Sequence, residues 1–141
     1  MKRAALLGLL IASTVVSDAL TLSKNEEFAR DAAVQWLELI DAHRFEEAAS
    51  QGSQEIRSFE NWKHQFATQR EPLGRANKRY LIELKHTAIV PGVPEVRSYT
   101  VIRFKTSFEH KAAAIEEIVL TKMGCCWEIF RYSIAEVTSG G

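Results

Sequence analysis

The sequence predicts one α+β domain, in which three N-terminal helices pack on a bent four-stranded antiparallel sheet. Apolar residues recur at helical spacing in the first half of the chain and alternate with polar residues in the second half. Helices followed by a run of strands are typical of α+β proteins rather than of parallel α/β proteins. An irregularity in the last strand predicts the bend.

Residues 1–19 have the pattern of a secretory signal peptide. Met1-Lys2-Arg3 is basic, residues 4–16 are apolar or small apart from Ser13 and Thr14, and Ser17-Asp18-Ala19 ends in a small residue. The apolar run is shorter than the roughly 20 residues of a membrane-spanning helix. We therefore expect cleavage after Ala19 and a periplasmic or secreted protein with no membrane span. A retained anchor is the alternative.

Residues 20–137 are expected to form the single domain, and residues 138–141 a flexible tail. Without Lys2, Arg3 and Asp18, the 18 basic and 18 acidic residues of the chain become 16 and 17. This balance gives no electrostatic reason to expect a nucleic-acid partner.

The first helix is expected from about Lys24 to Ala42. Ser23 and Glu26 fit a capping box, in which each side chain binds a backbone N–H of the first turn. A single apolar stripe follows at helical spacing and consists of Ala29, Ala33, Trp36, Leu37 and Ile40. This stripe predicts the face that packs on the sheet.

Two shorter helices are expected before the sheet. The second spans Phe45 to Ser50, and the third spans about Ser58 to Arg70, with Phe59, Trp62 and Phe66 on one face. Pro72 disfavours helical geometry in the residue before it, so Glu71–Gly74 closes the third helix.

Four strands are expected from alternating patterns: Arg79–Thr87, Ser98–Phe108, Ala113–Thr121 and Cys125–Val137. In the first strand, Tyr80, Ile82 and Leu84 form the apolar set. In the second strand, Ile102, Phe104 and Phe108 lie on one side and Tyr99 and Val101 on the other. Lys122-Met123-Gly124 is expected to be the last tight turn.

The last strand changes phase in its middle. Trp127 and Ile129 share one face, whereas Tyr132 and Ile134 fall on the other. One extra residue near Phe130-Arg131, a β-bulge, returns all four to one face and bends the sheet. A bent sheet around a long helix is the half-cone of the cystatin-like and nuclear-transport-factor-like folds.

Several motifs along the chain resemble those of one family. They are Ala33, Trp36, Leu37 and Asp41, then Trp62, then Arg70-x-Pro72-Leu73-Gly74 with Arg79, and the closing Trp127-x-Ile129-x-x-Tyr132-x-Ile134. The chain resembles, over nearly its whole mature length, the exported bacterial proteins grouped as domain of unknown function 4019. The resemblance implies a nuclear-transport-factor-like shape and an exported location, and it implies no activity.

The two cysteines of the chain, Cys125 and Cys126, are adjacent. Neighbouring residues of a strand point to opposite faces, so a disulfide between them is geometrically unfavourable. We expect two small hydrophobic residues, one of which faces the core. A vicinal disulfide, an intermolecular disulfide or a contact with a soft metal is the alternative.

No metal site or cofactor is predicted. His43, His64, His86 and His110 are scattered, without the spacing that places two imidazoles together. A site made by Cys126 and His110 is a weak alternative. The sequence also lacks a nucleophile elbow, a phosphate-binding loop and a dinucleotide fingerprint.

Asp41 and Glu117 are weak candidates for a catalytic acid or base. A carboxyl group in an apolar pocket between the long helix and the sheet has a raised pKa, which suits proton transfer. The favoured interpretation is structural. In that case Asp41 binds Arg44 or the backbone, and Glu117 pairs with Arg103 or Arg131.

Arg70 and Arg79 are candidates for binding an anionic ligand, because arginine makes bidentate contacts to carboxylates. The favoured interpretation is again structural, in which Arg70 binds carbonyls at its helix end and Arg79 pairs with Glu117. The weak candidates for an apolar ligand pocket, which are also core candidates, are Trp36, Tyr99, Trp127 and Tyr132.

These observations favour a non-enzymatic module of the cell envelope that binds a small anionic or apolar ligand or takes part in an interaction. One alternative is a small isomerase- or lyase-like enzyme with a carboxylate base. Another is a structural homodimer.

Overall fold

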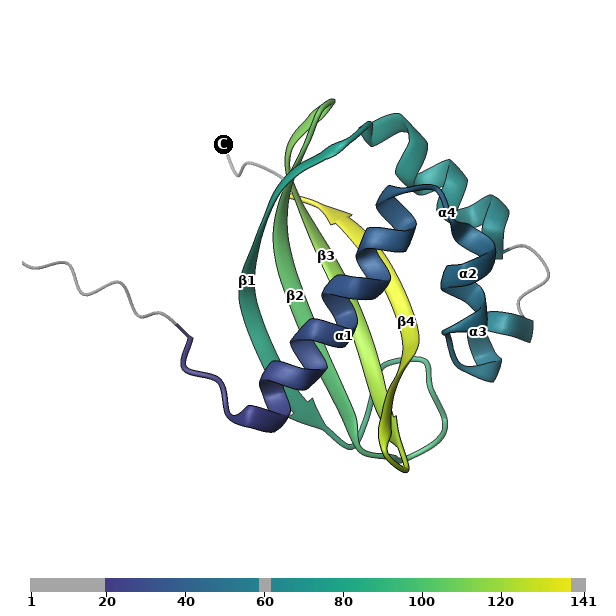
Figure 1. Cartoon of the computed structure of the whole chain (residues 1–141), viewed down its shortest axis with the longest axis vertical. Coiled ribbons are helices and arrows are strands. Elements are labelled where there is room, and N and C mark those ends of the chain that lie inside the picture. The colour runs from purple at the N-terminus through teal and green to yellow at the C-terminus, as the bar shows by residue number, and fades with distance from the viewer. Residues whose placement is uncertain (1–19, 59–61, 138–141) are drawn as a thin grey trace, which may run out of the picture.

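A computed structural model of the chain describes residues 20–58 and 62–137 (Figure 1). Its helices are α1 (Lys24–Asp41), α2 (Phe45–Ser50), α3 (Gln54–Ser58), α4 (Trp62–Arg70) and the 3₁₀ helix η1 (Glu71–Leu73). Its strands are β1 (Ala76–Thr87), β2 (Tyr99–Phe108), β3 (Lys111–Met123) and β4 (Cys126–Glu136). The expected signal peptide, the expected tail and Phe59 lie outside the described residues.

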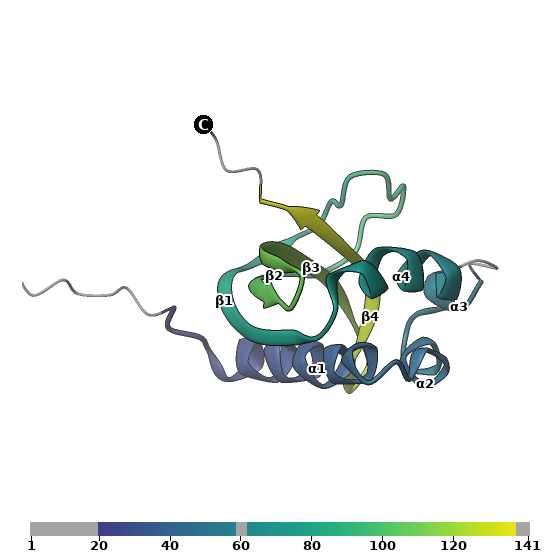
Figure 2. The same ribbon diagram turned by 90° about the horizontal axis from the view of Figure 1, so that it is seen from above.

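The strands form one antiparallel sheet in the order β1-β2-β3-β4. The sheet is curved, α1 crosses one of its faces, and α2 to α4 lie beside β4 (Figures 1 and 2). The α+β class and the four-stranded antiparallel sheet are therefore confirmed. The expected set of three N-terminal helices is wrong, because the described residues form four α-helices and η1, and these extend to Leu73, past the middle of the chain.

The sequence pattern of α1 predicts its contacts. Ser23 Oγ accepts the Glu26 N–H, and the Glu26 carboxylate accepts the Ser23 N–H at 2.8 Å, which completes the capping box. The five residues of the predicted stripe are the buried residues of the helix. The helix ends at Asp41, and His43 turns the chain with a φ of 57°.

The predicted bulge in β4 is confirmed. Arg131 pairs with Val119 and Ile129 pairs with Leu120, which leaves Phe130 as the extra residue. As a result Ile129 and Tyr132 both pack in the core under α1, while Phe130 packs on the opposite, convex face.

A second bulge, which the sequence pattern did not predict, lies in β1. Leu81 pairs with Phe104 and Glu83 pairs with Arg103, so Ile82 is the extra residue. Leu81 and Leu84 pack against the core, whereas Tyr80 and Ile82 are exposed. The expected apolar set of this strand is therefore wrong for Tyr80 and Ile82, because a bulge shifts the alternation by one residue.

Apolar residues are buried on both faces of the sheet. The concave side holds the main core with α1, and the convex side holds a smaller cluster made by Val90, Tyr99, Val101, Val119 and Phe130. The segment between β1 and β2, residues 88–98, supplies Val90 and thus covers part of the convex face. Among the described helices, none combines the length and the apolar composition needed to cross a membrane.

Candidate functional site

Four charged side chains meet at one end of the concave face, where α1 and α4 end. The Arg79 guanidinium contacts both oxygens of Asp41, at 2.5 and 2.8 Å, and both oxygens of Glu116, at 2.5 and 3.0 Å. Arg70 donates a further hydrogen bond to Asp41 at 3.0 Å. Two arginines and two carboxylates thus form a cluster with no net charge, which we call the ionic cluster.

Glu116 is the most deeply buried member, with no exposed side-chain surface. Besides Arg79, its carboxylate accepts hydrogen bonds from the Thr106 hydroxyl and, at 2.6 Å, from the Tyr132 hydroxyl. Burial and the neighbouring Glu116 charge raise the pKa of Tyr132 well above its usual value, so its hydroxyl stays protonated. The buried carboxylate is therefore compensated by one cation and two neutral donors.

Burial alone would raise the pKa of Asp41. The hydrogen bonds and positive charges of Arg79 and Arg70 outweigh this effect and hold the pKa below the usual 3.8. Asp41 is consequently ionised at neutral pH. An ionised carboxylate that already accepts three arginine hydrogen bonds is better suited to stabilising the fold than to accepting a proton.

Arg70 is anchored by the turn that follows α4. Its side chain is 3% exposed, donates to the Gly74 carbonyl and lies over the Phe108 ring at 4.4 Å. Gly74 has a φ of 73°, and a Cβ there would lie 2.9 Å from the Glu109 Cβ. This turn therefore requires glycine, and it places Arg70 beside Asp41.

The structure separates the two predicted catalytic candidates. Asp41 pairs with Arg70 and Arg79, not with Arg44, which instead binds Glu47. Glu117 lies on the convex face and pairs with Arg103 at 2.7 Å, as the structural interpretation predicts. It lines a second hollow, also of about 390 Å³, with Glu83 and Ile115. The expected pair between Arg79 and Glu117 is wrong, since the partner of Arg79 on β3 is Glu116.

Glu116 was missed in the sequence, although the alternation of β3 contains a signal for it. Glu116 shares its phase with Ala114, Ile118 and Leu120, all of which are fully buried. An acidic residue in the apolar phase of a strand indicates a buried partner, because an unpaired buried charge is very costly.

The four aromatic candidates do not form one pocket. Trp36 and Tyr132 are in contact, with ring centroids 5.3 Å apart, and both pack against Phe66. Tyr99 is buried in the convex cluster, and Trp127 lies near the β3–β4 turn with Lys122 over its ring. Trp36 and Tyr99 are thus core residues on opposite faces of the sheet.

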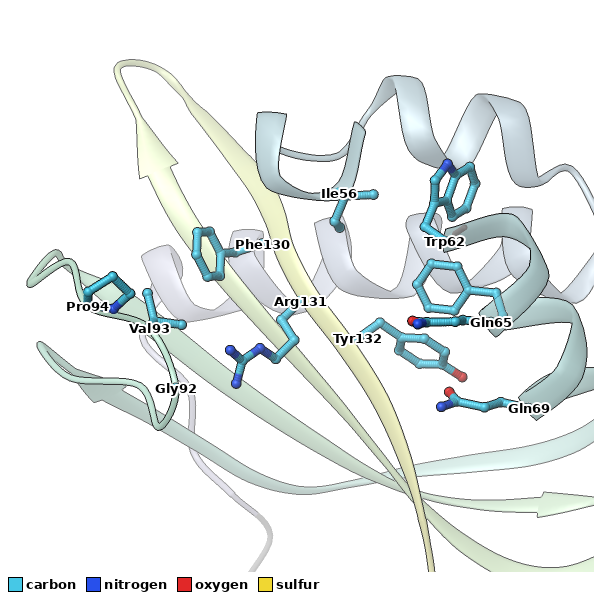
Figure 3. Close-up of a pocket in the computed structure, with 11 residues that line it drawn as sticks. Ile56, Trp62, Gln65, Gln69, Gly92, Val93, Pro94, Phe130, Arg131 and Tyr132 are labelled. Carbon is cyan, nitrogen blue, oxygen red and sulfur yellow. The ribbon is translucent and has the colours of Figure 1, made fainter. Parts of the chain in front are cut away.

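A cavity of about 390 Å³ lies along the outer edge of β4 (Figure 3). One wall comes from α3 and α4, the other from the segment between β1 and β2, and β4 forms the floor. We call it the edge groove. Its described lining residues are Ile56, Trp62, Gln65, Phe66, Gln69, Gly92, Val93, Pro94, Phe130, Arg131 and Tyr132. Of the six predicted ligand-binding residues, Tyr132 is the one that lines it.

Three polar side chains face this largely apolar groove. Gln65 and Gln69 lie one helical turn apart on α4 and are exposed, and Arg131 lies between them and Val93 (Figure 3). Arg131 donates to the Pro91 carbonyl at 2.8 Å, and no carboxylate of the described residues pairs with it. The guanidinium therefore keeps donors free for a ligand.

Only weak signals for this groove are present in the sequence. Gln65 and Gln69 were identifiable as one polar stripe beside Trp62 and Phe66, but nothing local indicated that β4 lies opposite them. The sequence suggests Arg131 only as a partner for Glu117. In the structure Glu117 pairs with Arg103 instead.

Cys125 and Cys126 form a vicinal disulfide and are both exposed. The expectation of a core-facing cysteine is wrong, because the residues lie at the tip of the β3–β4 hairpin, beyond the core. His110 and Cys126 lie near opposite ends of the 13-residue strand β3, which excludes a shared site. Within the described ranges, no three His, Cys, Asp or Glu side chains gather at one place.

One known protein family matches most of the chain. The family described as "Protein of unknown function (DUF4019)" matches residues 32–132, which include the ionic cluster and the described lining of the edge groove. No curated protein and no solved structure matches the chain. The match spans well over half of the 141 residues, so the chain belongs to this family of proteins of unknown function.

Proposed function

We propose that the protein is a non-enzymatic binding module whose edge groove takes a small amphipathic organic anion. The observation that carries the proposal is Arg131, a cation without a carboxylate partner among the described residues, at an apolar cavity. The volume of about 390 Å³ falls within the roughly 300–1,000 Å³ of small-molecule sites.

The apolar part of the ligand is expected to lie against α3 and α4. Ile56, Trp62 and Phe66 are each less than 10% exposed and line that wall. Gln65 and Gln69 supply amide donors and acceptors beside it. A few polar groups on an apolar wall orient a ligand, while burial of apolar surface supplies most of its affinity.

The lining also argues against catalysis in the groove. Its described residues include no carboxylate, histidine, cysteine or serine, and the Tyr132 hydroxyl donates to Glu116. The acid Asp41 lies in the charge-neutral ionic cluster. A proton-transfer mechanism needs a titratable group next to the substrate, and the described lining offers none that is free.

We further propose the half-cone class, cystatin-like or nuclear-transport-factor-like, for this domain. The curvature of the sheet around α1 and the bulges in β1 and β4 support it (Figure 2). In this chain the concave space is occupied by aromatic rings and the ionic cluster, so the proposed ligand site lies at the sheet edge instead.

Octanoate is expected to bind the groove at least about tenfold more tightly than octanamide, since hydrogen bonds to charged groups contribute about 1.5–3 kcal/mol. Arg131→Gln should remove this preference. Titration calorimetry measures both affinities.

Arg103→Gln is the matched control, because Arg103 lies on the same sheet but is paired with Glu83 and Glu117. Its octanoate affinity should equal that of the wild type. Equal affinity of the wild-type protein for octanoate and octanamide, or no binding of either, would show that the groove is not an anion site.

We also propose that the protein is exported to the periplasm or secreted. The signal-like residues 1–19 support this, and so does the disulfide, because disulfides persist in oxidising compartments. Mass spectrometry of protein from intact cells is expected to find a new N-terminus near Leu20. Full-length protein in the cytoplasm or the inner membrane would contradict export.

A further inference from the structure

Three of the four sulfur-containing residues of the chain lie at one place. The sequence contains two cysteines and two methionines, and apart from Met1 all of them lie within residues 123–126. These residues form the tip of the β3–β4 hairpin, where Gly124 and Cys125 make a two-residue turn. Gly124 has a φ of 61°, which fits the first position of such a turn.

Register brings the three sulfur-bearing side chains together. Met123 and Cys126 are directly opposite partners in the β3–β4 pairing. Opposite residues of an antiparallel pair project from the same face, with Cβ atoms about 4.5–5.5 Å apart. The Cys125 sulfur is bonded to the Cys126 sulfur, so it lies at the same place. Met123 is 54% exposed and both cysteines are exposed, which leaves all three side chains accessible.

We propose that the reduced hairpin tip binds one Cu(I) ion through the Met123 Sδ and the Sγ atoms of Cys125 and Cys126, and that the disulfide form does not. Thiolate and thioether ligands select soft Cu(I) among the common metal ions. Zinc needs four N, S or O ligands, and the described residues provide no cluster of three or more His, Cys, Asp or Glu for it.

Binding requires prior two-electron reduction of the disulfide, for example by a reductant of the dithiol class. The dithiol gives two electrons and two protons, the Cys125–Cys126 bond breaks to two thiols, and the reductant becomes a disulfide. Cu(I) then replaces the two thiol protons, forms two Cu–thiolate bonds and takes the neutral Met123 thioether as third donor. The redox state of the vicinal pair thereby controls the metal site.

The test is an anaerobic competition between the purified protein and the Cu(I) chelator bicinchoninate, with and without prior reduction by a phosphine that is then removed. The reduced protein is expected to bind one equivalent of Cu(I) and the disulfide form none. Zn(II) should bind much more weakly.

Variants at the exposed tip separate this site from adventitious binding. Cys126→Ser should weaken Cu(I) binding by more than the roughly 10–100-fold seen when an outer-shell partner is lost, and Met123→Leu by about tenfold. His110→Gln, an exposed residue at the other end of β3, is the control and should leave the affinity unchanged. Equal Cu(I) binding before and after reduction, or unchanged binding in Met123→Leu and Cys126→Ser, would overturn the proposal.

Discussion

Arg79→Ala is expected to lower the free energy of unfolding by about 3–5 kcal/mol, the range for removing one partner of a buried ion pair. Arg79 is 17% exposed, and its loss leaves Glu116, with no exposed surface, without a cation. Asp41 would keep Arg70 alone. Urea unfolding followed by circular dichroism measures the change.

Arg103→Ala provides the control for this prediction. Arg103 also binds two carboxylates, Glu83 and Glu117, but it is 37% exposed on the convex face. Exposed ion pairs typically contribute less than about 1 kcal/mol, so this variant should be nearly as stable as the wild type. If Arg79→Ala and Arg103→Ala lowered the free energy of unfolding by similar amounts, the ionic cluster would stabilise the fold no more than an exposed ion pair does.

A double variant tests whether the stranded charge causes the loss. Arg79→Met combined with Glu116→Leu removes one cation and one anion and leaves Asp41 paired with Arg70. Apolar replacement of a whole buried pair is often neutral or stabilising, so the double variant should be more stable than Arg79→Ala. A double variant that is less stable would contradict this explanation.

Trp36→Ala is expected to cost about 3–5 kcal/mol, as for other buried large aromatic residues. Trp36 is 1% exposed and packs edge to face on Tyr132 and Phe66. Its Nε1 also donates to the Ala48 carbonyl at 2.8 Å, which ties α1 to α2. The substitution removes both the packing and this hydrogen bond. For a domain of ordinary stability, little folded protein would be left.

Trp127→Ala makes the same chemical change at a half-buried position near the hairpin tip. It should cost clearly less than Trp36→Ala, because less apolar surface leaves the core and less cavity is created. Thermal melts of the two variants give the comparison. A melting temperature of Trp36→Ala close to that of the wild type would place Trp36 outside the core.

Local patterns in the sequence were sufficient for α1, for the presence of four strands and for the bulge at Phe130. The stripe from Ala29 to Ile40 and the phase change between Ile129 and Tyr132 are properties of neighbouring residues, and helical or strand geometry converts them directly into buried faces. The ion pair between Glu117 and Arg103 was among the alternatives, although the contact itself is set by the β2–β3 register, in which the two residues are direct partners.

The partner of Arg79 and the edge groove depended on the tertiary structure. The unpredicted bulge at Ile82 sets which β1 side chains face inward, and the β2–β3 register places Glu116 beside Phe104, two pairs away from Thr106. The groove needs α4 beside β4, more than 50 residues apart in the chain.

The sequence by itself therefore determined the fold class and the faces of α1 and β4, because these follow from short-range periodicity, and its motifs carried the family resemblance. The tertiary structure alone decided that Glu116 joins Asp41 around two arginines and that Arg131 stays without a carboxylate partner among the described residues. Each of these depends on strand register and helix placement. They are set by packing across the whole domain, and neighbouring residues do not encode them.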